Sequence, residues 1–177
     1  MAIEEPDGPV SEPIEQFRAM LAESPAWRQW IGGTPEDADA HLYETAALPF
    51  SNAPYTRAQI EALRPFGIVN ILPSLGVEMR MAASDTITET TRVEIEIQAN
   101  ISPQLPYREV SRAFNNRMGR IMRDLYDLSL DGSENRPFIN RIYTTGPICR
   151  CDPDVRTSEG DYLFLRIVGE VGVRAGR

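Results

Sequence analysis

The residues of this chain that could support catalysis are few and scattered. Its one histidine is His41, and its two cysteines, Cys149 and Cys151, are separated by a single residue. A Ser/His/Asp or Cys/His relay would depend on His41 alone, for which the sequence offers no obvious partner. Two thiols supply half of a four-ligand zinc site, and so short a spacing strains a disulfide. We therefore expect free thiols in a reducing compartment.

Two further groupings contain metal-binding or acid/base side chains. The thiols could join Asp152, Asp154 or His41 around a metal, but Cys-x-Cys followed by Asp-Pro favours a loop that tolerates thiols. Glu94 and Glu96 lie two residues apart on one face of an alternating segment, beside Arg92, where ordinary solvation explains them without chemistry. The sequence contains neither a Walker-type phosphate loop nor a GxGxxG motif. We expect no enzymatic activity, no metal and no cofactor.

Length and charge restrict the classes of protein that fit. A chain of 177 residues suits one domain, which would bury about 70% of the surface that the unfolded chain exposes. The net charge of -8 argues against a protein that coats nucleic acid by charge alone. All 18 positive charges are arginines, which reflects either a GC-rich genome or a use of planar, multidentate contacts at interfaces.

The sequence predicts no membrane segment. No apolar run approaches the ~18 residues that cross a bilayer. The first residues are acidic and lack the apolar core of a signal peptide. We therefore expect a soluble protein that is made in a cytoplasm.

The N-terminal segment differs from the rest of the chain. Residues 1–13 contain three prolines, four acids and a glycine, a composition that cannot bury enough apolar surface to fold by itself. We expect an extended acidic arm that a neighbouring subunit holds in place, followed by one domain over residues 14–177.

Helical signals follow the arm. A first helix is expected from Pro13, with Ser11 as its cap, and the Ser24-Pro25 pair interrupts it before a continuation over residues 26–31. Thr34 then caps a helix that should run to about Ala47. A short helix is expected over residues 56–63.

The remainder alternates sheet, long helix and sheet. Residues 90–101 alternate apolar and polar side chains over five pairs, which is typical of a half-buried antiparallel strand. An amphipathic helix of about 25 residues begins near Leu105. We predict an α+β fold in which a small mixed, mostly antiparallel sheet packs against one long helix and the N-terminal helices. Its other strands should cover 66–72, 76–83, 138–145 and 161–173, with Ser84–Glu89 as the tip of a hairpin.

The long helix has a basic outer face within an acidic protein. Arg108, Arg112 and Arg120 fall on one line at four-residue steps, with Asn116 between the last two. Three interpretations stay open: a solvated face balanced by nearby acids, a salt-bridge surface between subunits, or contact with a polyanion such as DNA in a channel.

The order of these segments resembles the tail terminator, or tail completion, proteins of long-tailed bacteriophages and gene transfer agents. The resemblance spans residues 14–173 and rests on weak motifs in a specific order. These motifs are Phe17–Ala22, Ser24–Trp27, Leu63–Phe66, the long hairpin, the long helix and Asp161–Phe164.

The resemblance implies a structural virion protein without an active site. In that family six copies form a ring that caps the tail tube, stops its polymerisation and docks onto the head-side connector, while DNA passes through the lumen as cargo. Expected partners are further copies of the chain, the tube protein and the connector or stopper, and the expected location is the neck of a virion assembled in bacterial cytoplasm. The hairpin residues Ser84, Asp85, Thr86, Ile87, Thr88 and Glu89 are expected to contact the neighbouring subunit or the tube, and Arg108, Arg112 and Arg120 to line the lumen or an interface.

Other classes remain as alternatives. Another neck component, such as a head completion or stopper protein, shares the small size and ring symmetry. A small cytoplasmic enzyme or ligand-binding domain would show a closed apolar pocket with converging polar groups. A nucleic-acid-binding regulator would need salt-sensitive binding that the net charge disfavours.

Overall fold

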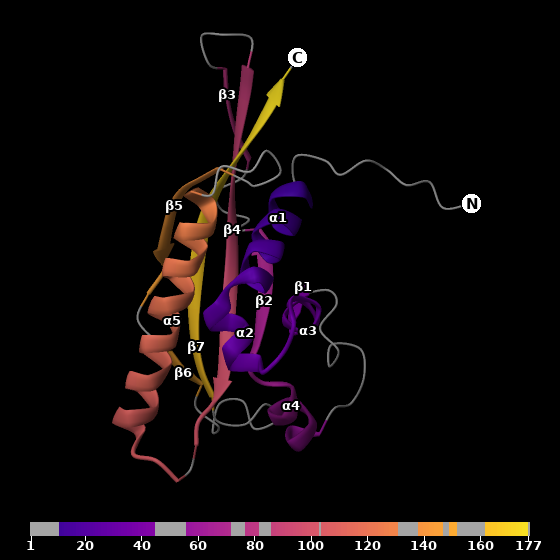
Figure 1. The fold of residues 1–177 in the computed structure, drawn as a ribbon. Coiled ribbons are helices and arrows are strands. Elements are labelled where there is room, and N and C mark those ends of the chain that lie inside the picture. Colours follow the sequence, from indigo (N-terminus) through magenta and orange to yellow (C-terminus); the bar gives the residue numbers. More distant parts are fainter. Residues whose placement is uncertain are drawn as a thin grey trace, which may run out of the picture.

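The computed structural model describes residues 11–44, 56–71, 77–81, 86–102, 104–130, 138–146, 149–151 and 162–176, in part by their backbone alone. Two long strands, β4 (Thr86–Asn100) and β7 (Tyr162–Gly176), pair antiparallel over their whole lengths and form the spine of the molecule (Figure 1). The other elements are α1 (Ser11–Glu23), α2 (Pro25–Ile31), α3 (Pro35–Ala40), β1 (Leu42–Glu44), α4 (Arg57–Leu63), β2 (Phe66–Ile71), β3 (Val77–Met81), α5 (Tyr107–Leu130), β5 (Phe138–Thr144) and β6 (Cys149–Cys151).

The described strands form one seven-stranded sheet in which the order β1-β2-β4-β7-β5 runs from edge to edge. β2 and β3 follow each other along the same edge of β4, and β5 and β6 do so along the outer edge of β7. β1 and β2 are parallel and all other pairs are antiparallel. The mixed, mostly antiparallel sheet and the α+β class predicted from sequence are confirmed.

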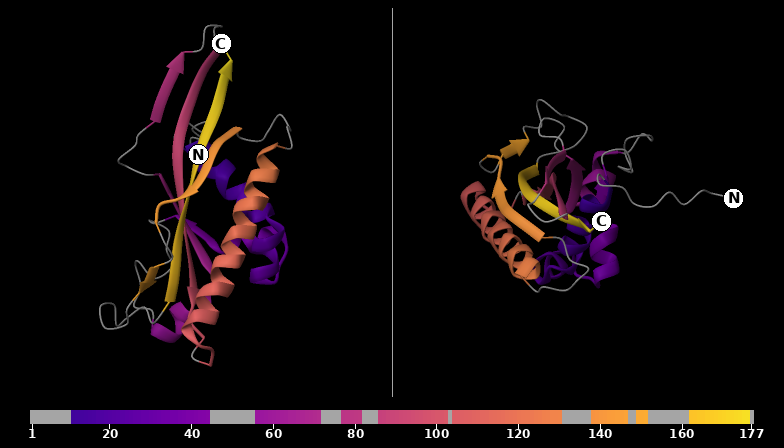
Figure 2. Two further views of the ribbon diagram at one scale, coloured as in Figure 1. Left: turned by 90° about the vertical axis from the view of Figure 1, so that its left-hand side faces the viewer. Right: turned by 90° about the horizontal axis from the view of Figure 1, so that it is seen from above.

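The helices cover one face of this sheet. α1, α2 and α5 lie on the same side, as the edge-on view shows, and α3 packs against α1 and α2 near the β1 edge (Figure 2). The alternation of β4 determines this arrangement, because Val93, Ile95 and Ile97 on the helical side are completely buried. From α5, the stripe of Phe114, Met118, Ile121 and Leu125 meets them. Each such side chain contributes ~1.5–3 kcal/mol through its burial.

The helix starts follow local capping chemistry. Thr34 accepts a hydrogen bond from the amide of Asp37, whose carboxylate in turn accepts one from the amide of Thr34. These bonds to the amide and hydroxyl of Thr34 lower the pKa of Asp37 below its ordinary value. Thr56 and Gln59 form the same reciprocal cap at α4, whereas at α2 the Ser24 hydroxyl accepts a hydrogen bond from the amide of Trp27. The Thr34 cap is thus confirmed.

Four predictions about boundaries are wrong. α1 begins at Ser11, so residues 11–13 belong to the helix and not to the arm; residues 1–10 lie outside the described part. α3 ends at Ala40 and the chain continues as β1, because Leu42–Glu44 pairs with Gly67–Val69. Thr86–Glu89 is not a hairpin tip but paired strand, bonded to β3 on one side and β7 on the other. Cys149–Cys151, expected in a loop, forms β6 against the start of β7.

Beyond the helices, the sheet continues as a projecting arm. β3, the first residues of β4 that pair with it and the last residues of β7 extend past the ends of α1 and α5 (Figures 1 and 2). We call these three segments the strand arm. Within the described part of the chain, residues 173–176 have no strand on their outer edge, since β5 pairs with β7 only as far as Gly172.

Candidate interaction surfaces

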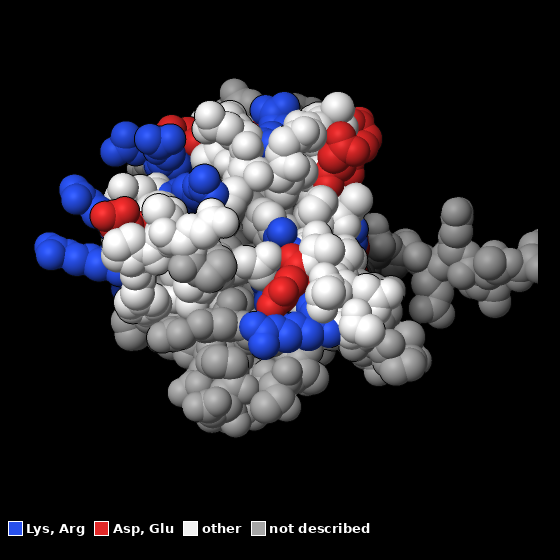
Figure 3. Space-filling model, turned by 90° about the horizontal axis from the view of Figure 1, so that it is seen from below, with Lys and Arg blue, Asp and Glu red and all other residues white. Residues whose placement is uncertain are grey.

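The outer face of α5 is basic and open to solvent. Arg108, Arg112, Arg120 and Arg123 are all exposed, and in the described part of the chain none of them forms an ion pair or hydrogen bond. In the view from below, blue side chains gather on the α5 side of the molecule (Figure 3). The predicted basic face therefore exists, with Arg108, Arg112 and Arg120 all at the surface.

The fifth arginine of α5 has a structural role. The guanidinium of Arg117 lies 5.0 Å from the ring centroid of Trp30, a cation–π distance. Trp30 also meets the ring of Phe114 edge-on, at 5.8 Å between centroids. Arg117 thus ties α5 to α2 and is not part of the free basic face.

One acid expected to balance the basic face is engaged elsewhere. Asp124 is half-buried, and its Oδ2 accepts hydrogen bonds from the hydroxyl of Ser24 at 2.7 Å and from the amide of Ala26 at 2.8 Å. It therefore completes the N-terminal cap of α2 and does not neutralise its neighbours. On the exposed surface of α5 only Glu109 and Asp127 remain to oppose four arginines.

The exposed large apolar side chains lie on the same helix or just before it. Among the described residues these are Leu105, Tyr107, Tyr126 and Leu130, and the last two are 57% and 65% exposed. A hollow of about 390 Å³ adjoins Leu130, between Pro25 and Leu128. Arginine and tyrosine beside apolar side chains is a composition typical of protein–protein interfaces.

The second surface is the face of the sheet opposite the helices, where charged side chains pair across the strands. Arg92 donates to Glu170 at 2.9 Å, and Arg166 donates to Glu96 at 2.8 Å. Arg166 also lies 3.8 Å from Glu94. We call these five residues the charged ladder. Their ion pairs join β4 to β7 on the face of the sheet opposite the helices.

Glu94 is the least well compensated member of the charged ladder. Its side chain is only 12% exposed, and burial raises the pKa of Glu94 above its ordinary value. The positive charge of Arg166 opposes that rise in pKa and the neighbouring carboxylate of Glu96 adds to it. An acid/base function is not implied, because cross-strand pairing accounts for both carboxylates.

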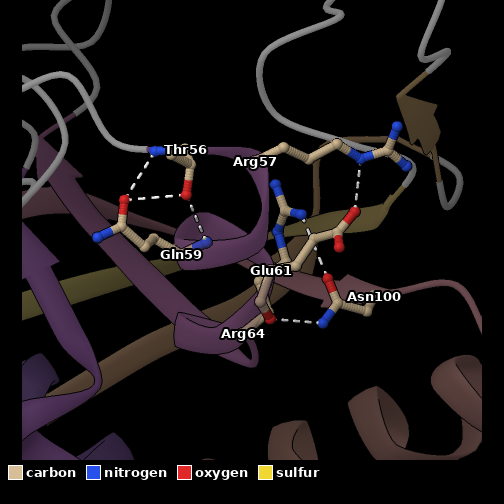
Figure 4. A network of polar contacts seen from close by, with 6 residues as sticks. All are labelled: Thr56, Arg57, Gln59, Glu61, Arg64 and Asn100. Atoms are coloured by element: carbon tan, nitrogen blue, oxygen red, sulfur yellow. Dashed lines mark hydrogen bonds and ion pairs between the residues drawn. The ribbon is translucent and has the colours of Figure 1, made fainter.

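At the lower end of the sheet, Arg64 fastens the entry to β2. Its side chain is 7% exposed and its guanidinium stacks 3.9 Å from the ring centroid of Tyr162. It donates to the side-chain oxygen of Asn100 at 3.3 Å, and Asn100 donates to the backbone carbonyl of Glu61 at 2.7 Å (Figure 4). This network holds α4 against the end of β4.

A small pocket opens beside this network. It has a volume of about 300 Å³ and is lined by Trp30, Phe114 and Leu163, with Arg64 and Arg117 among its polar residues. That volume is at the lower limit for small-molecule sites. Both arginines already stack on aromatic rings.

Among the described residues, the potential catalytic and metal-binding side chains are not brought together. Nδ1 of His41 lies 2.9 Å from the carbonyl oxygen of Pro65, at the C-terminal cap of α3. The described residues contain no group of three His, Cys, Asp or Glu side chains placed to hold a metal ion. Asp152 and Asp154 lie outside the described residues, as do Ser84 and Asp85 of the predicted contact segment. Within the described part of the chain, no helix has the length and apolar character needed to cross a bilayer.

Comparison with known proteins leaves the fold and these surfaces as the basis for interpretation. The sequence matches no family model, and no curated protein matches it significantly.

Proposed function

We propose that this chain is a tail terminator, a structural virion protein whose ring caps a phage tail tube, stops its polymerisation and docks with the head-side connector. The proposal rests on the resemblance described above and on a fold that offers surfaces for assembly. A terminator must bind the tube on one side and refuse further tube subunits on the other. A sheet with helices on one face and a charged ladder on the other supplies two unlike surfaces.

The observation that carries the proposal is the strand arm. It projects past the helices, and β7 leaves the backbone edge of residues 173–176 unpaired within the described part of the chain. Such an edge is a template on which another chain can add a strand. A protein that acts alone has little use for it, whereas a ring subunit can reach its neighbour or the tube with it.

The expected partners follow from this proposal. Copies of the chain form the ring, which is a hexamer in the family it resembles, and the tube protein and the connector or stopper bind its two ends. DNA passes through the lumen as cargo. The contact segment Thr86–Glu89 lies in the arm, so its backbone bonds to β3 and β7 fix its position.

The most direct test removes the outer edge of the arm. Deleting residues 173–177 removes pairing partners of residues 86–89 and leaves the helix-covered part of the sheet intact. We expect a folded protein, with an unchanged far-ultraviolet circular dichroism spectrum per residue, that no longer caps purified tail tubes in negative-stain images. Arg57→Ala, which removes an exposed pair on α4, is the control and should cap normally. Normal capping by the truncated chain would contradict the proposed role of the arm.

The runner-up is another neck component, a head completion or stopper protein. It would use the same arm and ring symmetry but bind a different end of the junction. Mixing the wild-type protein separately with tail tubes and with filled heads distinguishes the two. Binding to heads in the absence of tubes would favour the runner-up.

A further inference from the structure

The two lateral edges of the molecule carry opposite charge. α5 lies at the β5 edge of the sheet, and α3 lies at the β1 edge, at the level of the middle of α5 (Figure 1). Seen from below, positive side chains gather on the α5 side and negative ones on the α3 side (Figure 3). The net charge of -8 is therefore unevenly distributed.

The α5 edge presents cations without partners. Arg108, Arg112, Arg120 and Arg123 are exposed and form no ion pair with described residues. We call these four residues the basic face. An exposed arginine whose guanidinium N–H groups have no partner favours planar acceptors, above all carboxylates.

The α3 edge presents the matching anions. Glu36 lies in the first turn of α3 and Glu44 ends β1, and both are exposed and without an ion pair in the described part of the chain. Two nearby acids are already engaged: Asp39 accepts a two-pronged hydrogen bond from Arg18, and Asp37 belongs to the Thr34 cap. Glu15 on α1 lies about one helical turn from Arg18, which bonds Asp39 of α3, and is also exposed. We call Glu15, Glu36 and Glu44 the acidic corner.

We propose that the basic face of one copy binds the acidic corner of the next copy. This inference rests on the proposed ring and names the surfaces that build it. Because the two patches occupy different sides of the same chain, their contact is heterologous and repeats from copy to copy. A repeating contact of that kind closes into a ring when the rotation between copies permits it.

A second copy fits the basic face better than a nucleic acid does. Exposed Tyr126 and Leu130, with the hollow beside Pro25, continue the basic face with apolar surface. A protein partner buries such surface favourably, whereas a phosphate backbone does not. The acidic remainder of the chain repels a polyanion and complements the basic face of a neighbour.

Charge exchange between the two patches tests the inference. In one variant, Arg112→Glu and Arg123→Glu make both edges acidic. In the other, Glu36→Arg and Glu44→Arg make both edges basic. We expect each variant alone to self-associate at least about 100-fold more weakly than wild type, since like charges face each other. Mixed in equal amounts, the two should assemble again, because each supplies the charge that the other lacks.

Sedimentation velocity at low salt, with the full-length protein, measures the association. Salt at about 1 M should dissociate the wild-type and mixed assemblies, since the Debye length falls to ~3 Å. The control Arg57→Glu, on α4 and away from both patches, changes the net charge in the same direction as the Arg112→Glu, Arg123→Glu variant and should assemble like wild type.

The outcomes separate this inference from the proposed function. Rings that form equally well with either variant alone would overturn the inference and leave the terminator role intact. The inference would also be overturned if the wild-type chain and the equal mixture of the two charge-exchanged variants both stayed monomeric at low salt. If Arg112→Glu abolished DNA binding but left self-association unchanged, the basic face would be a nucleic-acid site, and the inference would be overturned as well. Absence of any binding to tubes would instead refute the proposed function.

Discussion

The carboxylate of Asp124 on α5 accepts hydrogen bonds from the hydroxyl of Ser24 and the amide of Ala26, although Ser24 precedes it by 100 residues. The sequence places Asp124 among arginines, where it is expected to offset their charge. In the structure it is the second half of the cap on α2, together with Ser24, whose hydroxyl accepts from the amide of Trp27. The long helix and the N-terminal helices are therefore joined by polar bonds as well as by apolar packing.

Replacing Asp124 by alanine should lower the free energy of unfolding by ~2 kcal/mol. The substitution leaves the buried Ser24 hydroxyl and an amide of α2 without their acceptor, which costs more than the loss of an exposed bond. Urea denaturation followed by circular dichroism measures the change. Asp127→Ala, an exposed acid on the same helix, should stay within ~0.5 kcal/mol of wild type. Equal effects for the two variants would mean that Asp124 is not a cap.

Replacing glycine by alanine should change the stability of the protein in opposite directions at two positions. A Cβ at Gly169 on β7 would lie 2.7 Å from the ring of Phe17, so Gly169→Ala should destabilise the protein by ~1–3 kcal/mol. A Cβ at Gly119 on the exposed side of α5 meets nothing within 4 Å, so Gly119→Ala should stabilise it by ~0.5–1 kcal/mol. Thermal melts of the two variants give the comparison. Tolerance of alanine at position 169 would show that α1 does not pack closely on β7.

Removing the Arg64 side chain should be more costly than removing that of Arg57. Arg64 stacks on Tyr162 and bonds Asn100 in a nearly buried site, so Arg64→Ala should cost ~3 kcal/mol. Arg57 forms one exposed pair with Glu61, which contributes less than ~1 kcal/mol. Arg64→Lys distinguishes the contribution of the positive charge from that of the planar guanidinium, because the lysine ammonium keeps the charge but cannot stack as a planar group. A lysine variant as stable as wild type would show that charge alone matters here.

Sequence reasoning succeeded where a repeating pattern coincides with an element of the fold. The stripe from Phe114 to Leu125 and the alternation from Val93 to Ile97 predicted α5 and β4, because their periods report directly which side is buried. Local capping signals at Thr34 likewise appeared as predicted. These features depend on residues close together in the chain.

The errors share a different cause. Leu42–Glu44 reads as helix locally but becomes β1 because Gly67–Val69 offers a parallel partner far along the chain. Thr86–Glu89 is polar enough for a turn, yet two flanking strands pair with it. Strand pairing over long distances has no signature in a single short segment, so such strands are missed. The role of Asp124 was missed for the same reason.

The pH dependence of stability should reveal the free-energy cost of ionising the buried carboxyl group of Glu94. Its folded-state pKa is above the ordinary value of 4.5, so the folded protein holds this proton more tightly than the unfolded chain does. The cost of ionising Glu94 is therefore present above the folded pKa and disappears as the pH falls below the unfolded value. Glu94→Gln removes this cost and leaves Glu96 to pair with Arg166, so it should stabilise the protein by ~0.5 kcal/mol at neutral pH.

Urea denaturation at a series of pH values tests this expectation. The advantage of Glu94→Gln over wild type should shrink as the pH falls through the folded pKa of Glu94. Glu96→Gln is the matched control, because it removes the closest acceptor of Arg166 and should cost ~0.5–1 kcal/mol at neutral pH. If Glu94→Gln destabilised the protein at neutral pH as much as Glu96→Gln, attraction to Arg166 would outweigh burial at Glu94, and the charged ladder would hold both carboxylates equally.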